Sequence, residues 1–356
     1  MKFHFSYIAY PVERNLDKII PEVSIDSKYF TEEKYWVKCF DNDKNELVCE
    51  GELTYDLPYQ GTRQWYTNWR IELADSSGTI VETDIFDFTG KVVSIIIPSN
   101  AIGDNLAWFP YVEEFRKKHK CTVICRTYLY ELFEKEYPEI IFIKDVTPIK
   151  NIYAQYLIGI AYDSNPVVHP SYVLQHPLQQ IASDILGLPF KEIKPKVSIP
   201  NKPSPIKESY VCISEYKGGQ TNSYQETDFW QNIVDYLIDC GYKVVEVSLE
   251  PSSLKNIVNL QNHSLFDTIN YLNHCEFFIS GSTGPAWLAW AVDKHVFMIS
   301  DFTPENHEFQ SNCTRLFNKS NPTKRLATSR KEEEEFRKDP ITSKEVIQVI
   351  SEFIKL

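Results

Sequence analysis

The stretch EFFISGSTGPAWLAWAVDKHVFMIS, residues 276–300, decides the fold of this chain. It contains two apolar runs of strand-forming residues, Phe277–Ile279 and His295–Ser300, separated by a loop and a run of small residues. The loop at 281–284 is rich in Gly, Ser and Thr. Pro285 suits the first turn of a helix, because its missing N–H would have no partner there. Strand, glycine-rich loop, helix and strand in this order predict a βαβ unit of a parallel sheet.

The loop of residues 281–284 has two interpretations. Backbone N–H groups are free at a helix N-terminus and the helix dipole is positive there, which suits a bound phosphate. A tight turn that lets the helix pack on the sheet needs the same residue types, so the sequence leaves both interpretations open. On the following helix, Trp287 and Trp290 either stack on a nucleotide base or pack in the core, and packing is the better explanation for Trp290.

Composition limits the class of protein. A chain of 356 residues exceeds what one hydrophobic core usually supports, so we expect two or three domains. The apolar share of 43% and charged share of 24% are ordinary for a globular protein, and the net charge of −12 argues against a nucleic-acid partner. No window approaches 18 uncharged apolar residues and the N-terminus lacks a signal-peptide pattern. We therefore expect no membrane span and a cytoplasmic location.

Cysteine and histidine usage gives no sign of a metal site. The eight cysteines are dispersed, form no CxxC, and lie mostly in apolar runs, so we expect them to be reduced and structural. The histidines are dispersed too, and the sequence contains no HExxH, Walker lysine loop or GxGxxG. From the residues alone, a metal ligand set has little support.

Periodicity divides the chain into three predicted domains. Residues 1–88 carry short, aromatic-rich alternating segments between polar turns, which predicts an all-β domain for docking or assembly. Residues 89–200 and 201–356 alternate near-continuous apolar strands with helices, which predicts two Rossmann-like lobes. Residues 191–207 are rich in Pro and Lys, as in an interdomain linker, and 319–337 form a strongly charged, exposed segment. Two such lobes predict a ligand cleft at the carboxyl ends of their strands.

Three loops after predicted strands are candidates for that cleft. In the loop of residues 99–105, Asp104 is the only carboxylate, and it is either a helix N-cap or a general base. The helix that follows places Phe109 and Phe115 on its inner side, and Pro110 limits where that helix can begin regularly. In the loop of residues 215–220, Lys217 stands beside two glycines and either neutralises a phosphate or is solvated. The third loop is 281–284.

Several longer motifs resemble a known family. The run IGDNLAWFP at 102–110 resembles the GD-x-L-x-x-x-P signature of the heptosyltransferases of glycosyltransferase family 9. STGPAW at 282–287 stands where that family carries D-T-G-x-x-H. The longer run GDNLAWFPYVEEFRKKH at 103–119, with matches in 176–188 and 287–310, resembles the bacterial autotransporter O-heptosyltransferase family. The resemblance covers most of residues 1–318, including the β-rich N-terminal region.

The resemblance implies an α/β enzyme of the GT-B type, with two Rossmann-like lobes facing a cleft and an additional N-terminal all-β domain. It implies metal-independent transfer of a heptose from ADP-heptose to serine hydroxyls of an autotransporter-type protein by single displacement, with no cofactor. Asp104 matches the base, and the N–H groups of the 281–284 loop with the Thr283 hydroxyl would hold the leaving diphosphate. The donor side would comprise Lys217, Gly281, Ser282, Thr283, Gly284, Trp287 and Thr303, and the acceptor side Gly103, Asn105 and Gln179.

Two departures from the family pattern leave alternatives open. The family's phosphate-binding lysine falls by spacing at Asn222 or Ser223, whereas Lys217 lies several residues upstream. The family's cysteine cluster, a metal finger, is missing because no cysteine follows Cys313, so we expect no metal and leave a homo-oligomer open. The alternatives are a GT-B transferase with another nucleotide sugar or a glycan or lipopolysaccharide acceptor, and a degenerate, non-catalytic binding subunit.

Overall fold

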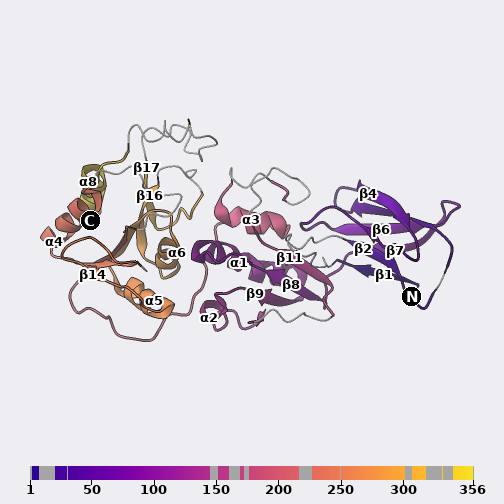
Figure 1. Cartoon of the computed structure of the whole chain (residues 1–356), viewed down its shortest axis with the longest axis horizontal. Helices are drawn as coiled ribbons and strands as arrows, with labels where there is room; N and C mark the ends of the chain where they lie inside the picture. The colour runs from indigo at the N-terminus through magenta and orange to yellow at the C-terminus, as the bar shows by residue number, and fades with distance from the viewer. Residues whose placement is uncertain are drawn as a thin grey trace.

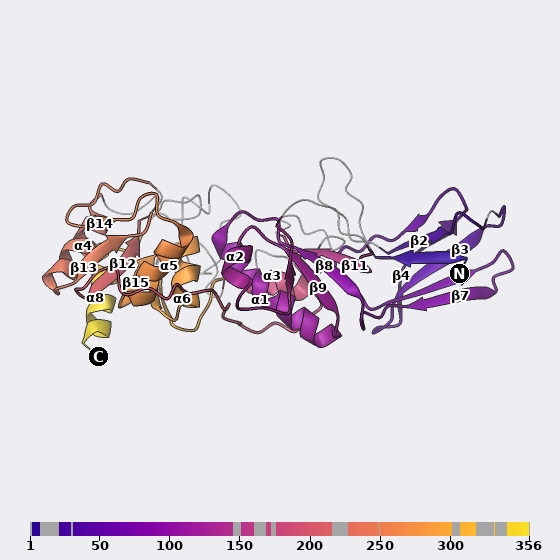
Figure 2. The same cartoon turned by 90° about the horizontal axis from the view of Figure 1, so that it is seen from below.

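The elements of the chain follow one another along one long axis (Figures 1 and 2). The N-terminal strands lie at one end, the second group of elements lies in the middle, and the C-terminal group lies at the other end. Among the described residues, no helix combines the length and the apolar character that crossing a bilayer demands. The structure is a computed structural model that describes residues 2–7, 21–29, 31–144, 151–159, 169–171, 176–215, 227–248, 250–300, 307–317, 331 and 340–355.

The N-terminal strands form two antiparallel sheets, in the orders β1-β2-β5 and β4-β3-β6-β7. Alternate residues of β3 and β6 are buried, as the alternating sequence predicts. The β structure expected for residues 1–88 is therefore present, while its standing as a separate domain stays a prediction. The strands are β1 (Phe3–Ser6), β2 (Glu22–Ile25), β3 (Tyr35–Asp41), β4 (Glu46–Leu53), β5 (Tyr59–Gln60), β6 (Trp69–Ala74) and β7 (Ile80–Ile85).

The middle group, here called the N-terminal lobe, is a parallel sheet in the order β10-β9-β8-β11 with three helices. The predicted inner face of α1, including Phe109 and Phe115, is fully buried. Pro110 does not limit where this helix begins: α1 runs through it from Ile102, because tertiary packing outweighs the lost backbone bond. The elements are β8 (Val92–Ile96), α1 (Ile102–His119), β9 (Thr122–Arg126), α2 (Tyr130–Phe133), β10 (Ile141–Phe142), β11 (Ala154–Leu157) and α3 (Leu178–Ile185).

The C-terminal lobe is a parallel sheet in the order β14-β13-β12-β15-β16-β17. The βαβ unit predicted for residues 276–300 is confirmed as β15-α6-β16. The edge strands β14 and β17 were not predicted. The charged segment predicted at 319–337 lies outside the described residues, apart from residue 331. The elements are β12 (Tyr210–Ser214), α4 (Phe229–Asp239), β13 (Lys243–Glu246), β14 (Val258–Asn259), α5 (Leu265–His274), β15 (Phe277–Ser280), α6 (Gly284–Ala291), β16 (His295–Ser300), β17 (Cys313–Phe317) and α8 (Ser343–Ile354).

The two lobes meet where α1 and α6 lie side by side (Figure 1). The contact is made at two glycines, each facing a side chain of the other helix. A Cβ on Gly284 would come 2.8 Å from the Cβ of Ile102, and a Cβ on Gly103 would come 3.0 Å from Cδ1 of Trp287. Both glycines lie in the first turn of their helices, so the N-termini of α1 and α6 meet each other.

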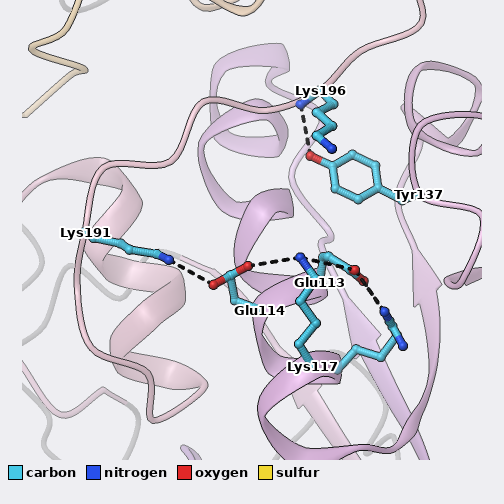
Figure 3. A network of polar contacts seen from close by, with 7 residues as sticks. Glu113, Glu114, Lys117, Tyr137, Lys191 and Lys196 are labelled. Carbon is cyan, nitrogen blue, oxygen red and sulfur yellow. Dashed lines mark hydrogen bonds and ion pairs between the residues drawn. The ribbon is translucent and has the colours of Figure 1, made fainter.

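The segment 191–207 joins the lobes, as predicted, and its first part is bonded to the N-terminal lobe (Figure 3), whereas Lys202 and Pro203 bond α5 of the C-terminal lobe. The Lys191 ammonium bonds the Glu114 carboxylate at 3.0 Å, and the Lys196 backbone N–H donates to the Tyr137 hydroxyl at 2.9 Å. The Lys and Pro composition predicted a linker, and these bonds show that the linker also packs on the N-terminal lobe.

We predict that Gly284→Ala destabilises the protein, because the new methyl would contact the branched Cβ of Ile102 and force α1 and α6 apart. Overpacking of this kind costs about 1–3 kcal/mol, which outweighs the gain in helix propensity. The free energy of unfolding, measured by urea titration, would show the loss.

Gly159→Ala is the matched control, because a Cβ built there meets no atom within 4 Å. It should change the free energy of unfolding by less than about 0.5 kcal/mol. Equal stability of the two variants would contradict the close helix contact.

Candidate functional site

The candidate site lies at the topological switch points of the two parallel sheets. In the N-terminal lobe the strand order reverses at β8, and in the C-terminal lobe it reverses between β12 and β15. Loops at such points are where open α/β sheets bind ligands. The loop after β8 leads into α1 and the loop after β15 leads into α6, so the helix contact described above brings both loops together. Lys217 and Thr303 lie outside the described residues.

Asp104 is in the first turn of α1 but is not its N-cap. The N-cap is Ala101, which has no side-chain capping bond, so the N-cap alternative for Asp104 is wrong. Its Oδ2 instead accepts a 2.6 Å hydrogen bond from the Ser99 hydroxyl, and the same hydroxyl oxygen accepts from the Ala101 N–H at 3.1 Å. The carboxylate is therefore held in a fixed position beside the N-terminus of α6.

The environment of Asp104 suits a proton acceptor. Burial raises its pKa above the ordinary value, and the Ser99 hydrogen bond and the charge of His307 partly offset that rise. A carboxylate whose basicity is increased by burial, and which is fixed by one donor, takes up a proton more readily than an exposed one. Burial, with a smaller contribution from the charge of Asp104, raises the pKa of Tyr128 to about 12.

Asn105 and Gly103 position the loop in this structure. The buried Asn105 amide donates to the backbone oxygens of Ser99 and Ala101 at 2.8 and 2.9 Å, and its oxygen accepts from the Thr127 hydroxyl at 2.5 Å. Gly103 faces Trp287, as described above. These contacts engage each polar atom of the Asn105 side chain, so the observed role of Asn105 is to hold the loop that carries the Asp104 carboxylate. That Asn105 and Gly103 contact the acceptor substrate stays a prediction.

The predicted donor loop begins α6. Thr283 is the N-cap, and its hydroxyl oxygen accepts from the Ala286 N–H at 3.4 Å and lies 3.2 Å from the Ser280 hydroxyl. Gly281, Ser282 and Gly284 flank it. The positive end of the α6 dipole thus meets that of α1, and two converging helix N-termini create a site that favours an anion.

Two further predicted site residues are engaged in packing. Trp287 is buried, with its ring edge-on to Trp290 and Phe309 at centroid distances of 5.6 and 5.1 Å. The Gln179 amide nitrogen donates to the Ile193 oxygen at 2.6 Å, and its oxygen accepts from the Ile193 N–H at 3.0 Å. The structure therefore shows Trp287 at the lobe contact and Gln179 clamping the linker. Their binding roles stay predictions.

Sequence analysis missed a buried carboxyl in the C-terminal lobe. Glu246 ends β13 beside β12 and is fully buried, and burial raises its pKa to about 8. Its Oε1 accepts from the Glu215 N–H at 3.1 Å, while its Oε2 and the buried Ser214 hydroxyl have no partner among the described residues. A Glu that ends an apolar strand, here β13 beside the switch-point strand β12, was the signal that could have found it.

The chain is similar to autotransporter heptosyltransferases. It is 27% identical over 340 residues to BAHTCr of Citrobacter rodentium, and the match covers 89% of this chain and 80% of that relative. TibC of Escherichia coli is 28% identical over 81% of this chain and 73% of its own length. BimC of Burkholderia thailandensis, described as an inactive autotransporter heptosyltransferase, is 27% identical over 70% of this chain and 62% of its own length. No family model matches the chain.

Solved structures of TibC have the same fold. One is described as a bacterial iron-containing dodecameric glycosyltransferase, with a TM-score of 0.85 at 21% identity. The other, in complex with ADP-D-beta-D-heptose, has a TM-score of 0.84 at 22% identity. Each alignment covers 99% of this chain and 96% of the other. The predicted resemblance and the α/β glycosyltransferase fold with parallel sheets are therefore confirmed.

The prediction that no metal takes part is contradicted by TibC, whose structure, similar to this chain, is described as iron-containing. That prediction relied on the missing cysteine cluster after Cys313, and the absence of one ligand set does not exclude another. In the part of the chain that the structure describes, no group of three or more His, Cys, Asp or Glu side chains is arranged to hold a metal ion. The described residues therefore do not fit an iron site.

We predict that Glu246→Gln removes a pH dependence of stability. In the folded protein Glu246 has a pKa of about 8, above its ordinary 4.5, so the folded state binds the proton more tightly than the unfolded state. Wild-type stability should therefore fall as the pH rises from about 4.5 to 8 and level off above. Glu246→Gln lacks this pH-dependent loss of stability. Its free energy of unfolding minus that of wild type should therefore increase between pH 4.5 and 8, by on the order of 2–5 kcal/mol.

Chemical denaturation at pH 5, 7 and 9 measures the effect. Glu208→Gln, at an exposed position, serves as the control and should follow the wild-type curve at each pH. A constant difference between Glu246→Gln and wild type from pH 5 to 9 would contradict the raised pKa.

Proposed function

We propose that this chain is a cytoplasmic glycosyltransferase that moves a heptose from ADP-heptose to serine hydroxyls of an autotransporter-type protein. The observation that carries the proposal is the Asp104 carboxylate, partly buried and fixed by Ser99, beside the converging N-termini of α1 and α6. The similarity to BAHTCr and TibC supports the choice of sugar and acceptor class. The ADP-heptose complex of TibC supports the donor.

In the proposed reaction, Asp104 accepts the proton of the serine hydroxyl while the serine oxygen attacks the anomeric carbon of the heptose. The bond between that carbon and the diphosphate oxygen breaks, and its electron pair leaves with ADP. Charge that develops on the diphosphate is stabilised by the first-turn N–H groups and dipole of α6 and by the Thr283 hydroxyl. A single displacement of this kind inverts the configuration at the anomeric carbon.

Polar groups of the C-terminal lobe complete the donor side of the proposal. Among the described residues the Glu246 Oε2 and the Ser214 hydroxyl have no partner, and they lie at the carboxyl edge of β12 and β13, where the hydroxyls of a nucleotide would give them partners. Lys217, Trp287 and Thr303 belong to the same side in this proposal. The N-terminal β domain at 1–88 would dock the protein acceptor or support a homo-oligomer, and the dodecameric state of TibC supports the latter.

We predict that Asp104→Asn lowers heptose transfer by about 10²–10⁴-fold, because the amide keeps the shape of the carboxylate but cannot accept the proton. The measurement is the intact mass of an autotransporter passenger co-expressed with each variant in cells that make ADP-heptose. Wild type should add mass increments of one heptose, and the variant should add few or none.

Asp239→Asn is the matched control, because Asp239 is exposed at the end of α4, and this variant should modify the passenger like wild type. Equal modification by Asp104→Asn would remove Asp104 from the role of base. No increment with wild type, despite binding of ADP-heptose, would favour another acceptor. A wild type that neither binds ADP-heptose nor modifies the passenger would favour a non-catalytic subunit, a state for which the inactive relative BimC is a precedent.

We predict that Ser99→Ala shifts the acid limb of the pH profile of kcat/KM to higher pH. The Ser99 hydroxyl lowers the pKa of Asp104 by hydrogen bonding to its charged form, so its removal leaves burial to raise that pKa further. The base is then protonated at a higher pH. The rate of ADP release, measured against pH, reports the shift, and Ser77→Ala, at a distant exposed turn, should leave the profile unchanged. An unmoved acid limb in Ser99→Ala would show that another group titrates in it.

A further inference from the structure

Cys39 of β3 and Cys49 of β4 lie directly opposite each other in an antiparallel sheet of the N-terminal region. Residues paired in this way point their side chains to the same face, and their Cα atoms lie roughly 4.5–5.5 Å apart. That separation is within the range of roughly 4.4–6.8 Å that a disulfide spans. The two thiols share a hydrogen bond, and both cysteines are free in this structure. The backbone therefore already holds the two sulfur atoms where a bond between them can form.

The two cysteines differ in their access to solvent. Cys39 is fully buried on the inner face of β3, whereas Cys49 is only partly buried. The chain that follows β5 passes beside Cys49, since a Cβ built on Gly61 would lie 3.5 Å from the Cys49 sulfur. A reagent that enters from solvent therefore meets Cys49 first, and Cys39 lies behind it.

The groups around Cys49 favour its thiolate form. The hydrogen bond from Cys39 lowers the pKa of Cys49 to about 6, with further hydrogen bonds from Tyr59 and Thr62, although burial opposes the change. Hydrogen bonds to a charged form stabilise that form. The same hydrogen bond, together with burial, raises the pKa of Cys39. Because the thiolate is the nucleophile, Cys49 is the reactive member and Cys39 the protonated one.

A second pair of neighbouring cysteines provides a comparison within the same chain. Cys212 of β12 and Cys275 after α5 also share a hydrogen bond, but both are buried. Burial raises the pKa of Cys212 well above its ordinary value, and the Cys275 thiol donates to the Leu272 backbone oxygen at 3.2 Å. Proximity is thus common to both pairs, whereas the accessible thiolate belongs to the Cys39–Cys49 pair.

We propose that Cys39 and Cys49 form a redox modification site, which hydrogen peroxide converts to a disulfide between β3 and β4. The Cys49 thiolate attacks one peroxide oxygen, the O–O bond breaks, and the departing hydroxide takes up a proton and leaves as water. The resulting Cys49 sulfenic acid is then attacked by the Cys39 sulfur. The S–O bond breaks, and the hydroxide leaves with the Cys39 proton as a second water. The two thiols lose two electrons and the peroxide gains them. This chemistry does not depend on the proposed heptose transfer.

The test treats the purified full-length protein with hydrogen peroxide, blocks the remaining thiols with iodoacetamide and digests the protein with trypsin without reductant. Cleavage after Lys38 and Lys44 places Cys39 in residues 39–44 and Cys49 in residues 45–63, so the disulfide joins two separate peptides. Mass spectrometry should find these peptides linked, in protein that runs as a single chain on a non-reducing denaturing gel. Dithiothreitol should separate them. The link between Cys212 and Cys275 should form at least about ten-fold more slowly.

Two variants separate the two steps. Cys39→Ser keeps a hydroxyl donor beside Cys49 and should stop the reaction at the Cys49 sulfenic acid, which dimedone traps, whereas Cys49→Ser should leave Cys39 unmodified. An unlinked wild-type pair at a peroxide dose that modifies the exposed Cys240 would overturn the proposal. So would equal rates for the two pairs, which would show that proximity alone decides, or a link that joins two chains. The wild-type measurement needs no variant to fold and no heptose transfer, so it tests the site by itself.

Discussion

The close contact between the first turns of α1 and α6 is the constraint on which the arrangement of the two lobes depends. Gly284 faces Ile102 and Gly103 faces Trp287, so neither helix has room for a larger residue at its contact position. The contact brings together two loops, far apart in the sequence, that each follow a switch-point strand. Because two helix N-termini converge there, an anionic group gains from both dipoles, and Asp104 lies beside that position.

Around this contact, polar side chains fix the loop that carries Asp104. Asn105 binds the loop backbone at two oxygens and is itself bound by Thr127, so the loop conformation is set from within the lobe. Ser99 then orients the carboxylate. In the proposed reaction Asp104 is the base, and such a group is most effective when its supporting residues hold it in position before the substrate arrives, as these bonds do.

The linker contributes to the structure beyond connecting the lobes. Gln179 clamps it at Ile193, and Glu192 bonds the backbone of the segment before β17. The linker thereby forms one wall of a cavity whose other walls belong to α3 and the C-terminal lobe. The fold is that of TibC over nearly the whole chain, and the described residues differ from an iron-containing protein in offering no metal ligand set.

The sequence by itself determined the local elements and the class of fold, whereas only the tertiary structure decided what each candidate residue touches. The apolar runs, the glycine-rich loop and Pro285 predicted β15, α6 and β16, because these patterns depend on neighbours along the chain. Short edge strands such as β17 were missed, since a neighbouring strand supplies their pairing. The tertiary structure excluded Asp104 as the helix N-cap and revealed Glu246, whose raised pKa arises from burial between strands. Burial and hydrogen bonding between distant residues depend on how the lobes pack together, and no local pattern records that packing.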